Sequence, residues 1–129
     1  MQFEFQGRSI SINMPDWPSL KAEVLRRFAQ GEGFALATIN LDHLVKLARD
    51  PDFRATYAAQ DLVCADGNPI VWLSKLARKP VSLVPGSDMV LPLASLAARE
   101  GVPLALMGFN PLVIIFAEGF VQLYQTLLH

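Results

Sequence analysis

The sequence predicts an α/β domain: a parallel sheet with helices on both faces, preceded by a short N-terminal β-hairpin. Short runs that are apolar throughout alternate along the chain with segments of helical periodicity. Strands of that kind are typical of parallel sheets that are buried on both faces. No linker, repeat or low-complexity stretch interrupts the alternation, so we expect a single domain over residues 1–129.

The strands come from apolar runs and the hairpin from alternation. Phe3 and Phe5, then Ile10 and Ile12, alternate with polar residues around Gln6-Gly7, which predicts the hairpin. The predicted strands of the sheet are 34–39, 62–65, 81–84 and 104–107.

The helices are marked by apolar spacing and by their start signals. Leucines and valines at helical spacing predict the first helix, over 20–28. The later helices start at asparagine, serine or aspartate caps or at prolines, which suit the first helical position. Their predicted starts are Asn40, Asp50-Pro51, Asn68-Pro69, Ser87 or Asp88, and Asn110-Pro111.

Composition excludes several classes of protein. With 52% hydrophobic residues among 129, the chain is long enough to bury one core. With eleven basic and twelve acidic residues, the chain lacks the net positive charge that is typical of proteins that bind nucleic acid. A lone cysteine favours a reducing compartment, and the N-terminus lacks the features of a signal peptide, so we expect a cytoplasmic protein.

The C-terminal stretch is unusually apolar. Residues 102–129 contain one acid, Glu118, and no Lys or Arg, but glycine, asparagine and proline interrupt the stretch too often for a membrane span. We expect a helix over 112–128 with an unburied apolar face. Such a face favours self-association or peripheral contact with the inner face of the cytoplasmic membrane.

A ligand site is expected at the carboxyl ends of the strands, where open α/β sheets bind their ligands. Each segment there combines small or polar residues with the start of a helix, whose free N–H groups suit phosphate. The four segments are 38–40, 66–68, 85–88 and 108–110.

Asp66 is the strongest candidate for chemistry at this edge. It follows an apolar strand and precedes a glycine, so its carboxylate could act as a general base or could merely cap the turn. Thr38 and Asn40 could bind a sugar or nucleotide, or could be a strand residue and a helix cap. Asp88 could orient a ligand or cap its helix.

No metal or cofactor is expected. Asp50-Pro51-Asp52 has the D-x-D form of metal-dependent glycosyltransferases but lies a helix length from the edge, where capping is the favoured role. Gly31-Glu32-Gly33 precedes a strand instead of following one, so it is no dinucleotide fingerprint.

Four other reactive or aromatic residues are predicted to be structural. Cys64 lies inside an apolar strand and is expected to be inert, and His43 to be solvated or a minor cap. Trp17 and Trp72 are expected in the core.

Three motifs in order together resemble the WecG/TagA/CpsF glycosyltransferase family. They are Thr38-Ile39-Asn40-Leu41-Asp42-His43, Asp61-Leu62-Val63-Cys64-Ala65-Asp66-Gly67 with Trp72, and Pro85-Gly86-Ser87-Asp88. The resemblance covers about residues 3–110 and implies a Rossmann-like fold. It further implies inverting, metal-independent transfer of a sugar (N-acetylmannosamine-type, glucose or related) from a UDP-sugar to a polyprenyl-diphosphate-linked acceptor, in cell-surface polysaccharide synthesis.

The resemblance also implies roles for individual residues. Asp66 matches the family's proposed base, and Thr38 and Asn40 match positions that line the donor pocket. Gly86 and Asp88 match its glycine–aspartate turn. The expected substrate-binding residues are Thr38, Asn40, Gly67, Asn68, Gly86, Asp88 and Gly108.

The chain departs from the family's pattern at two positions and in length. Leu83 stands where the family usually has arginine, and Phe109 where it has a second glycine. Family members are longer, so we expect an N-terminal portion with weak activity on its own. The alternative is a non-catalytic nucleotide-sugar-binding remnant. A generic nucleotide-binding domain such as an oxidoreductase module is disfavoured, because the glycine fingerprint is absent.

Overall fold

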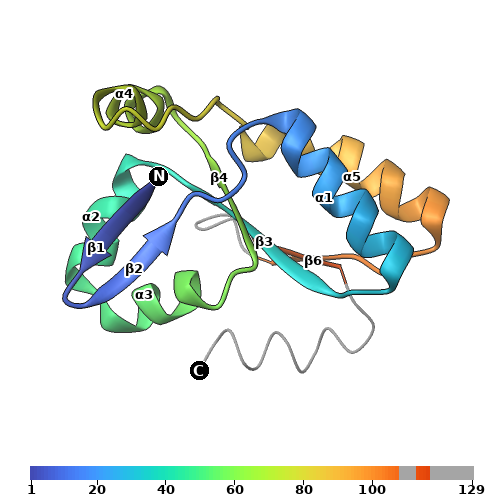
Figure 1. Ribbon diagram of the computed structural model, residues 1–129. Helices are drawn as coiled ribbons and strands as arrows, with labels where there is room; N and C mark the ends of the chain where they lie inside the picture. The colour runs from blue at the N-terminus through green and yellow to red at the C-terminus, as the bar shows by residue number, and fades with distance from the viewer. Residues whose placement is uncertain (108–112, 117–129) are drawn as a thin grey trace.

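The computed structural model describes residues 1–107 and 113–116. Two antiparallel strands come first, followed by alternating strands and helices (Figure 1). The elements are β1 (Gln2–Phe5), β2 (Arg8–Ser11), α1 (Trp17–Gln30), β3 (Phe34–Ile39), α2 (Leu41–Arg49), α3 (Pro51–Ala58), β4 (Leu62–Ala65), α4 (Asn68–Leu76), α5 (Gly86–Glu100), β5 (Ala105–Met107) and β6 (Val113–Phe116). The predicted hairpin and α/β class are confirmed.

The sheet has the order β4-β3-β6-β5 and is mixed. β3 and β4 are parallel, in a register that pairs Leu36 with Leu62 and Ile39 with Ala65. β6 runs antiparallel to both β3 and β5. The parallel sheet expected from the sequence is therefore interrupted by one antiparallel strand.

β6 also corrects the expected last helix. Residues 113–116 form a strand, although Pro111 suggested that a helix begins just before them. The sequence Val-Ile-Ile-Phe is β-branched and aromatic, and side chains of this kind pack well on a sheet and poorly in a helix. The rest of the expected helix, together with Gly108 and Phe109, lies outside the described residues.

The two faces of β3 carry separate cores. Ala35, Ala37 and Ile39 pack with the hairpin, α2, α3 and α4, whereas Phe34 and Leu36 pack with α1 and α5. Figure 1 shows the hairpin, α2 and α3 on one side of the sheet and α1 and α5 on the other. All six residues of β3 are buried, because both of its faces are covered. Helices on both faces are thus confirmed.

Aspartate and asparagine caps start three helices. The Asp16 carboxylate accepts the N–H of Ser19 at the start of α1, and hydrogen bonds with the side chain and then the backbone of Ser19 lower the pKa of the carboxyl. Asn40 caps α2 and Asp50 caps α3. α5 differs from the expectation: it begins at Gly86 after Pro85, without a side-chain cap, so neither Ser87 nor Asp88 caps it.

The strand expected over 81–84 does not form. The N–H of Val81 bonds to Oγ of Ser74, and those of Ser82 and Val84 bond to the carbonyls of Pro15 and Ala65. Prolines bracket this segment at 80 and 85 and have no N–H to donate to a ladder. The segment nevertheless runs beside the end of β4, where a strand would have brought it.

Across residues 1–107 and 113–116, no helix combines the length and apolarity that crossing a bilayer requires.

Candidate active site

Backbone hydrogen bonds bring three turns together at the carboxyl edge of β3 and β4. The N–H of Asp66 donates to the carbonyl of Ile39 over 2.8 Å, joining the turn after β4 to the end of β3. The N–H of Val84 donates to the carbonyl of Ala65 over 2.9 Å, joining the segment before α5 to the same edge. The predicted segments 38–40, 66–68 and 85–88 are therefore neighbours.

Asp66 is half-buried at the centre of this edge. Its Oδ2 lies 3.4 Å from the N–H of Gly86, the first residue of α5. None of the ion pairs found among the described residues involves Asp66. The carboxylate is thus oriented by the start of a helix and is not neutralised by a cation there.

Gly67 makes the sharp turn between β4 and α4. Its φ of +118° lies in a region that residues with a β-carbon rarely adopt, so the turn requires glycine. A β-carbon there would lie 3.8 Å from Cβ of Asn40, which places the turns after β3 and β4 in contact. Asn68 follows as the exposed first residue of α4.

Asn40 and His43 close the start of α2 by a reciprocal pair of hydrogen bonds. Oδ1 of Asn40 accepts the N–H of His43 over 2.9 Å, and Nδ1 of His43 accepts the N–H of Asn40 over 3.0 Å. The capping role of Asn40 is confirmed. His43 caps too, but it is only 3% exposed, so the expectation that it is solvated is wrong.

Tyr57, for which the sequence predicted no role, supports this edge from behind. Its hydroxyl donates to the carbonyl of Thr38 over 2.5 Å and lies 3.1 Å from Nδ1 of His43. Burial, and secondarily the charge of Asp66, raise the pKa of Tyr57 well above its ordinary value. Thr38 itself is buried in β3. A tyrosine seven residues into the helix that follows Asp50 carries no local signal of this contact.

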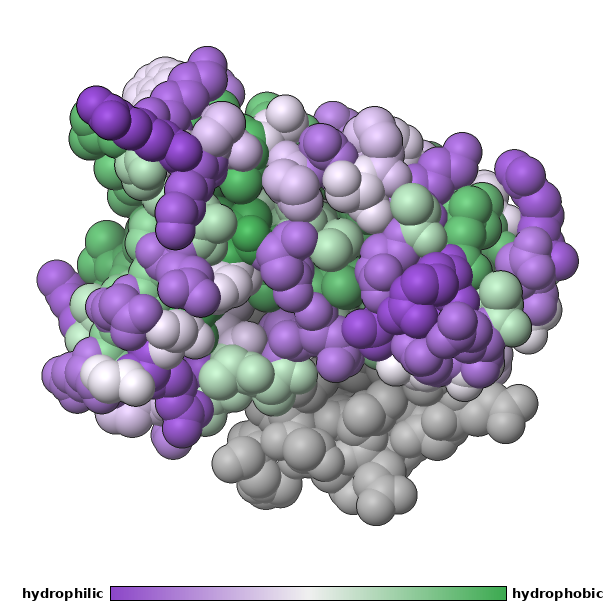
Figure 2. All heavy atoms as spheres, viewed as in Figure 1, coloured by the Kyte–Doolittle hydropathy of each residue, from purple (hydrophilic) through white to green (hydrophobic). Residues whose placement is uncertain are grey.

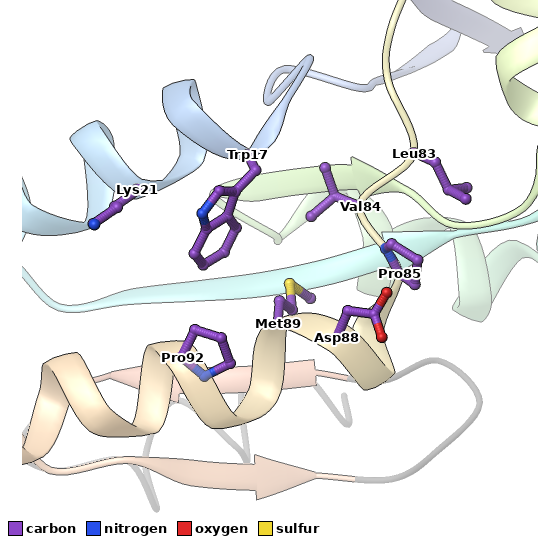
Figure 3. Close-up of a pocket in the computed structure, with 8 residues that line it drawn as sticks. All are labelled: Trp17, Lys21, Leu83, Val84, Pro85, Asp88, Met89 and Pro92. Atoms are coloured by element: carbon purple, nitrogen blue, oxygen red, sulfur yellow. The ribbon is translucent and has the colours of Figure 1, made fainter.

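A pocket of about 460 Å³ opens between α1, α5 and the segment before α5 (Figure 3). Trp17 and Lys21 line it from α1, and Leu83 and Asp88 line it opposite. The remaining lining residues are Val84, Pro85, Met89 and Pro92. Because Pro85 directly precedes Gly86, whose N–H faces Asp66, the pocket adjoins the carboxyl edge.

The structure corrects the assignment of Trp72 to the core, whereas Trp17 lies at the margin of the core. Trp17 is partly buried, packs against the core between α1 and α5, and presents its ring to the pocket in Figure 3. Trp72 is 65% exposed on α4. Asp88 and Leu83 are exposed at the pocket, so its polar groups are one carboxylate and the ammonium of Lys21.

Asp50 and Cys64, which the sequence predicts to be structural, are structural here. Asp50 accepts the N–H groups of Asp52 and Phe53 at the start of α3, as its capping role requires. Burial raises the pKa of the Cys64 thiol to about 12. In the part of the chain that the structure describes, no three His, Cys, Asp or Glu side chains gather as metal ligands would.

A family model described as Glycosyl transferase WecG/TagA/CpsF family matches residues 7–125. No solved structure matches the chain. The matched range covers β2, both parallel strands and the whole carboxyl edge around Asp66. This chain belongs to the WecG/TagA/CpsF family of glycosyltransferases.

Proposed function

We propose that the protein is an inverting glycosyltransferase that moves a sugar from a UDP-sugar to a polyprenyl-diphosphate-linked acceptor at the cytoplasmic face of the membrane. The sugar is N-acetylmannosamine, glucose or a relative, and the product serves cell-surface polysaccharide synthesis. Family membership supports a nucleotide-sugar donor and an acceptor in general. The observation that carries the proposal is the half-buried Asp66 carboxylate, set where three turns meet.

In this reaction Asp66 is the general base. The acceptor hydroxyl gives its proton to the carboxylate as its oxygen forms a bond to the anomeric carbon of the donor. The bond from that carbon to the diphosphate oxygen breaks on the opposite side, which inverts the anomeric centre. The hydrogen bond from Gly86 holds Oδ2, and the carboxylate keeps acceptor capacity for the incoming proton.

Two helix starts can stabilise the departing diphosphate. α4 begins beside Gly67 and α5 begins at Gly86. Neither helix has a side-chain N-cap, although Asp66 accepts the first N–H of α5. The positive ends of both helix dipoles are therefore at the edge that holds Asp66. Thr38, Asn40, Asn68 and Asp88 complete the proposed substrate-binding residues from the described part of the chain.

A second candidate function is non-catalytic binding of a nucleotide sugar. Leu83 favours it, because this exposed leucine lines the pocket where the family's pattern has a cation suited to a phosphate group. The two functions differ in turnover and share the donor site.

Titration calorimetry with UDP-glucose, UDP-N-acetylmannosamine and ADP-glucose tests the donor site. We expect the UDP-sugars to bind, free UDP to compete with them for the same site, and ADP-glucose to bind much more weakly. Asn40→Asp keeps a good helix cap and adds a negative charge beside the diphosphate, so it should weaken binding at least tenfold. Asp52→Asn, on the exposed first turn of α3, is the matched control and should leave binding unchanged. Equal binding by the wild type and Asn40→Asp would contradict the site.

A further inference from the structure

Helix α4 is attached to the domain by one face only. Ile70 and Ser74, four residues apart, are fully buried, and Oγ of Ser74 accepts the N–H of Val81 over 3.0 Å. Trp72 and Leu76 have the same four-residue spacing and lie on the opposite side of the helix. They are 65% and 81% exposed. A large aromatic and a leucine thus face outward from an otherwise anchored helix.

Three exposed cations lie on α4 or just after its end. Lys75 lies on the helix, and Arg78 and Lys79 follow directly after it. No acidic residue occurs from Gly67 to Ser87, and the ion pairs among the described residues include none of the three cations. Figure 2 shows hydrophilic and hydrophobic side chains next to each other at the upper left, where Figure 1 places α4.

We propose that the exposed face of α4 and the two cations that follow the helix (Trp72, Lys75, Leu76, Arg78 and Lys79) dock on an anionic lipid bilayer. Exposed Trp and Leu beside lysines and arginine are the composition of helices that lie in the membrane interface. The lysine and arginine charges complement anionic headgroups, and the absence of acids removes the repulsion that such a surface would otherwise meet. A strictly apolar partner surface would leave three cations unmatched.

Docking through α4 suits the proposed function, on which this step rests. α4 starts at Gly67 and Asn68, immediately after Asp66. Its nine residues span about 14 Å at 1.5 Å per residue, so a bilayer in contact with α4 lies within about one helix length of the carboxylate. A diphosphate headgroup on a polyprenyl anchor could reach the carboxyl edge from such a surface.

Co-sedimentation of the full chain with vesicles tests the proposal without any donor or acceptor. Vesicles of phosphatidylglycerol and phosphatidylcholine should bind the protein, pure phosphatidylcholine should bind it much less, and added salt should weaken binding. Each of Lys75→Gln and Lys79→Gln should weaken binding about fivefold. Trp72→Ser combined with Leu76→Ser should weaken it at least tenfold.

Leu91→Ser is the matched control, since Leu91 is 76% exposed on α5, outside the proposed surface. It should bind vesicles like the wild type. In a Trp17→Phe variant, the emission of Trp72 should shift to the blue on anionic vesicles. The proposal is overturned if Trp72→Ser/Leu76→Ser binds anionic vesicles as tightly as the wild type. It is equally overturned if Leu91→Ser loses as much vesicle binding as that double variant. It is also overturned if the free protein is an oligomer that the α4 variant dissociates, because α4 would then face a second copy. Donor binding, measured separately, stays the test of the proposed function.

Discussion

The N–H of Gly86 points at Oδ2 of Asp66 across 3.4 Å, joining residues twenty positions apart. This contact connects the turn after β4 to the first residue of α5, so the two motifs meet at one edge of the sheet. A backbone donor at this distance orients the carboxylate without neutralising it, which suits the general base that we propose.

Gly67→Ala should destabilise the protein by about 1–3 kcal/mol, because alanine is strained at a φ of +118°. It should also weaken UDP-sugar binding several-fold, since the turn contacts Asn40. Gly7→Ala is the control, with a φ of +84° in the hairpin turn, open space around it and no role at the carboxyl edge. Urea unfolding should show a lower free energy of unfolding in both variants, whereas calorimetry should show weaker UDP-sugar binding only for Gly67→Ala. Equal donor binding by both variants would show that this turn does not shape the site.

Tyr57→Phe should cost about 1–3 kcal/mol of unfolding free energy at neutral pH, because the buried Thr38 carbonyl loses its hydroxyl donor. Chemical denaturation measures the difference. A loss under about 0.3 kcal/mol would mean that the hydroxyl does not support the edge.

The same variant should change the alkaline stability profile. The pKa of Tyr57 is raised above its ordinary value of 10.0 in the folded protein. Above pH 10 the unfolded chain therefore ionises at Tyr57 while the folded protein keeps the proton, and stability falls as pH rises. Tyr57→Phe should lack this component, so the gap between the wild type and the variant should narrow from pH 10 upward. A constant gap would contradict the raised pKa.

Leu83→Arg should strengthen binding of a diphosphate-bearing ligand about fivefold or more, because it adds a fork of donors to the pocket that Lys21 and Asp88 line. Leu91→Arg adds the same charge at another exposed leucine, outside this pocket. Titration with UDP and with a soluble polyprenyl-diphosphate analogue separates the two variants. An equal gain in affinity from Leu91→Arg would show that the added net charge causes the effect, and not the position of the arginine in the pocket.

Cys64 should resist thiol reagents until the protein unfolds. The thiol is fully buried and its pKa is raised to about 12, so almost no thiolate is accessible at neutral pH. Because the chain has one cysteine, the chromophore released by a disulfide reagent measures the labelling of Cys64 alone. Rapid native labelling, at a rate close to that in urea, would contradict the burial.

Local signals predicted most of the fold. The runs at 34–39 and 62–65 are apolar on both faces, and the strands β3 and β4 have those bounds. Asn40, Asp50 and the prolines placed the helix starts, because capping depends on residues within one turn. The site edge was predictable in outline, since parallel strands end at the same edge.

Contacts between residues far apart in the sequence could not be predicted from such local signals. The segment 81–84 has the composition of a strand, but its N–H groups bond to Ser74, Pro15 and Ala65. The tyrosine that supports Thr38 comes from α3, nineteen positions away, and only the folded chain brings the two together. Trp72 faces outward because Ile70 and Ser74 occupy the buried face of α4, which helical spacing alone did not decide.

Sugar transfer by Asp66→Asn tests the central assignment most directly. Wild type and variant, each in stoichiometric excess over labelled UDP-sugar, are incubated with a polyprenyl-diphosphate-linked acceptor while donor binding is measured on the same preparations. Asparagine keeps the size of the side chain and cannot take the proton, so transfer should fall at least a hundredfold. The dissociation constant for the donor should stay within about twofold. Transfer by Asp66→Asn at the wild-type rate would show that another group is the base.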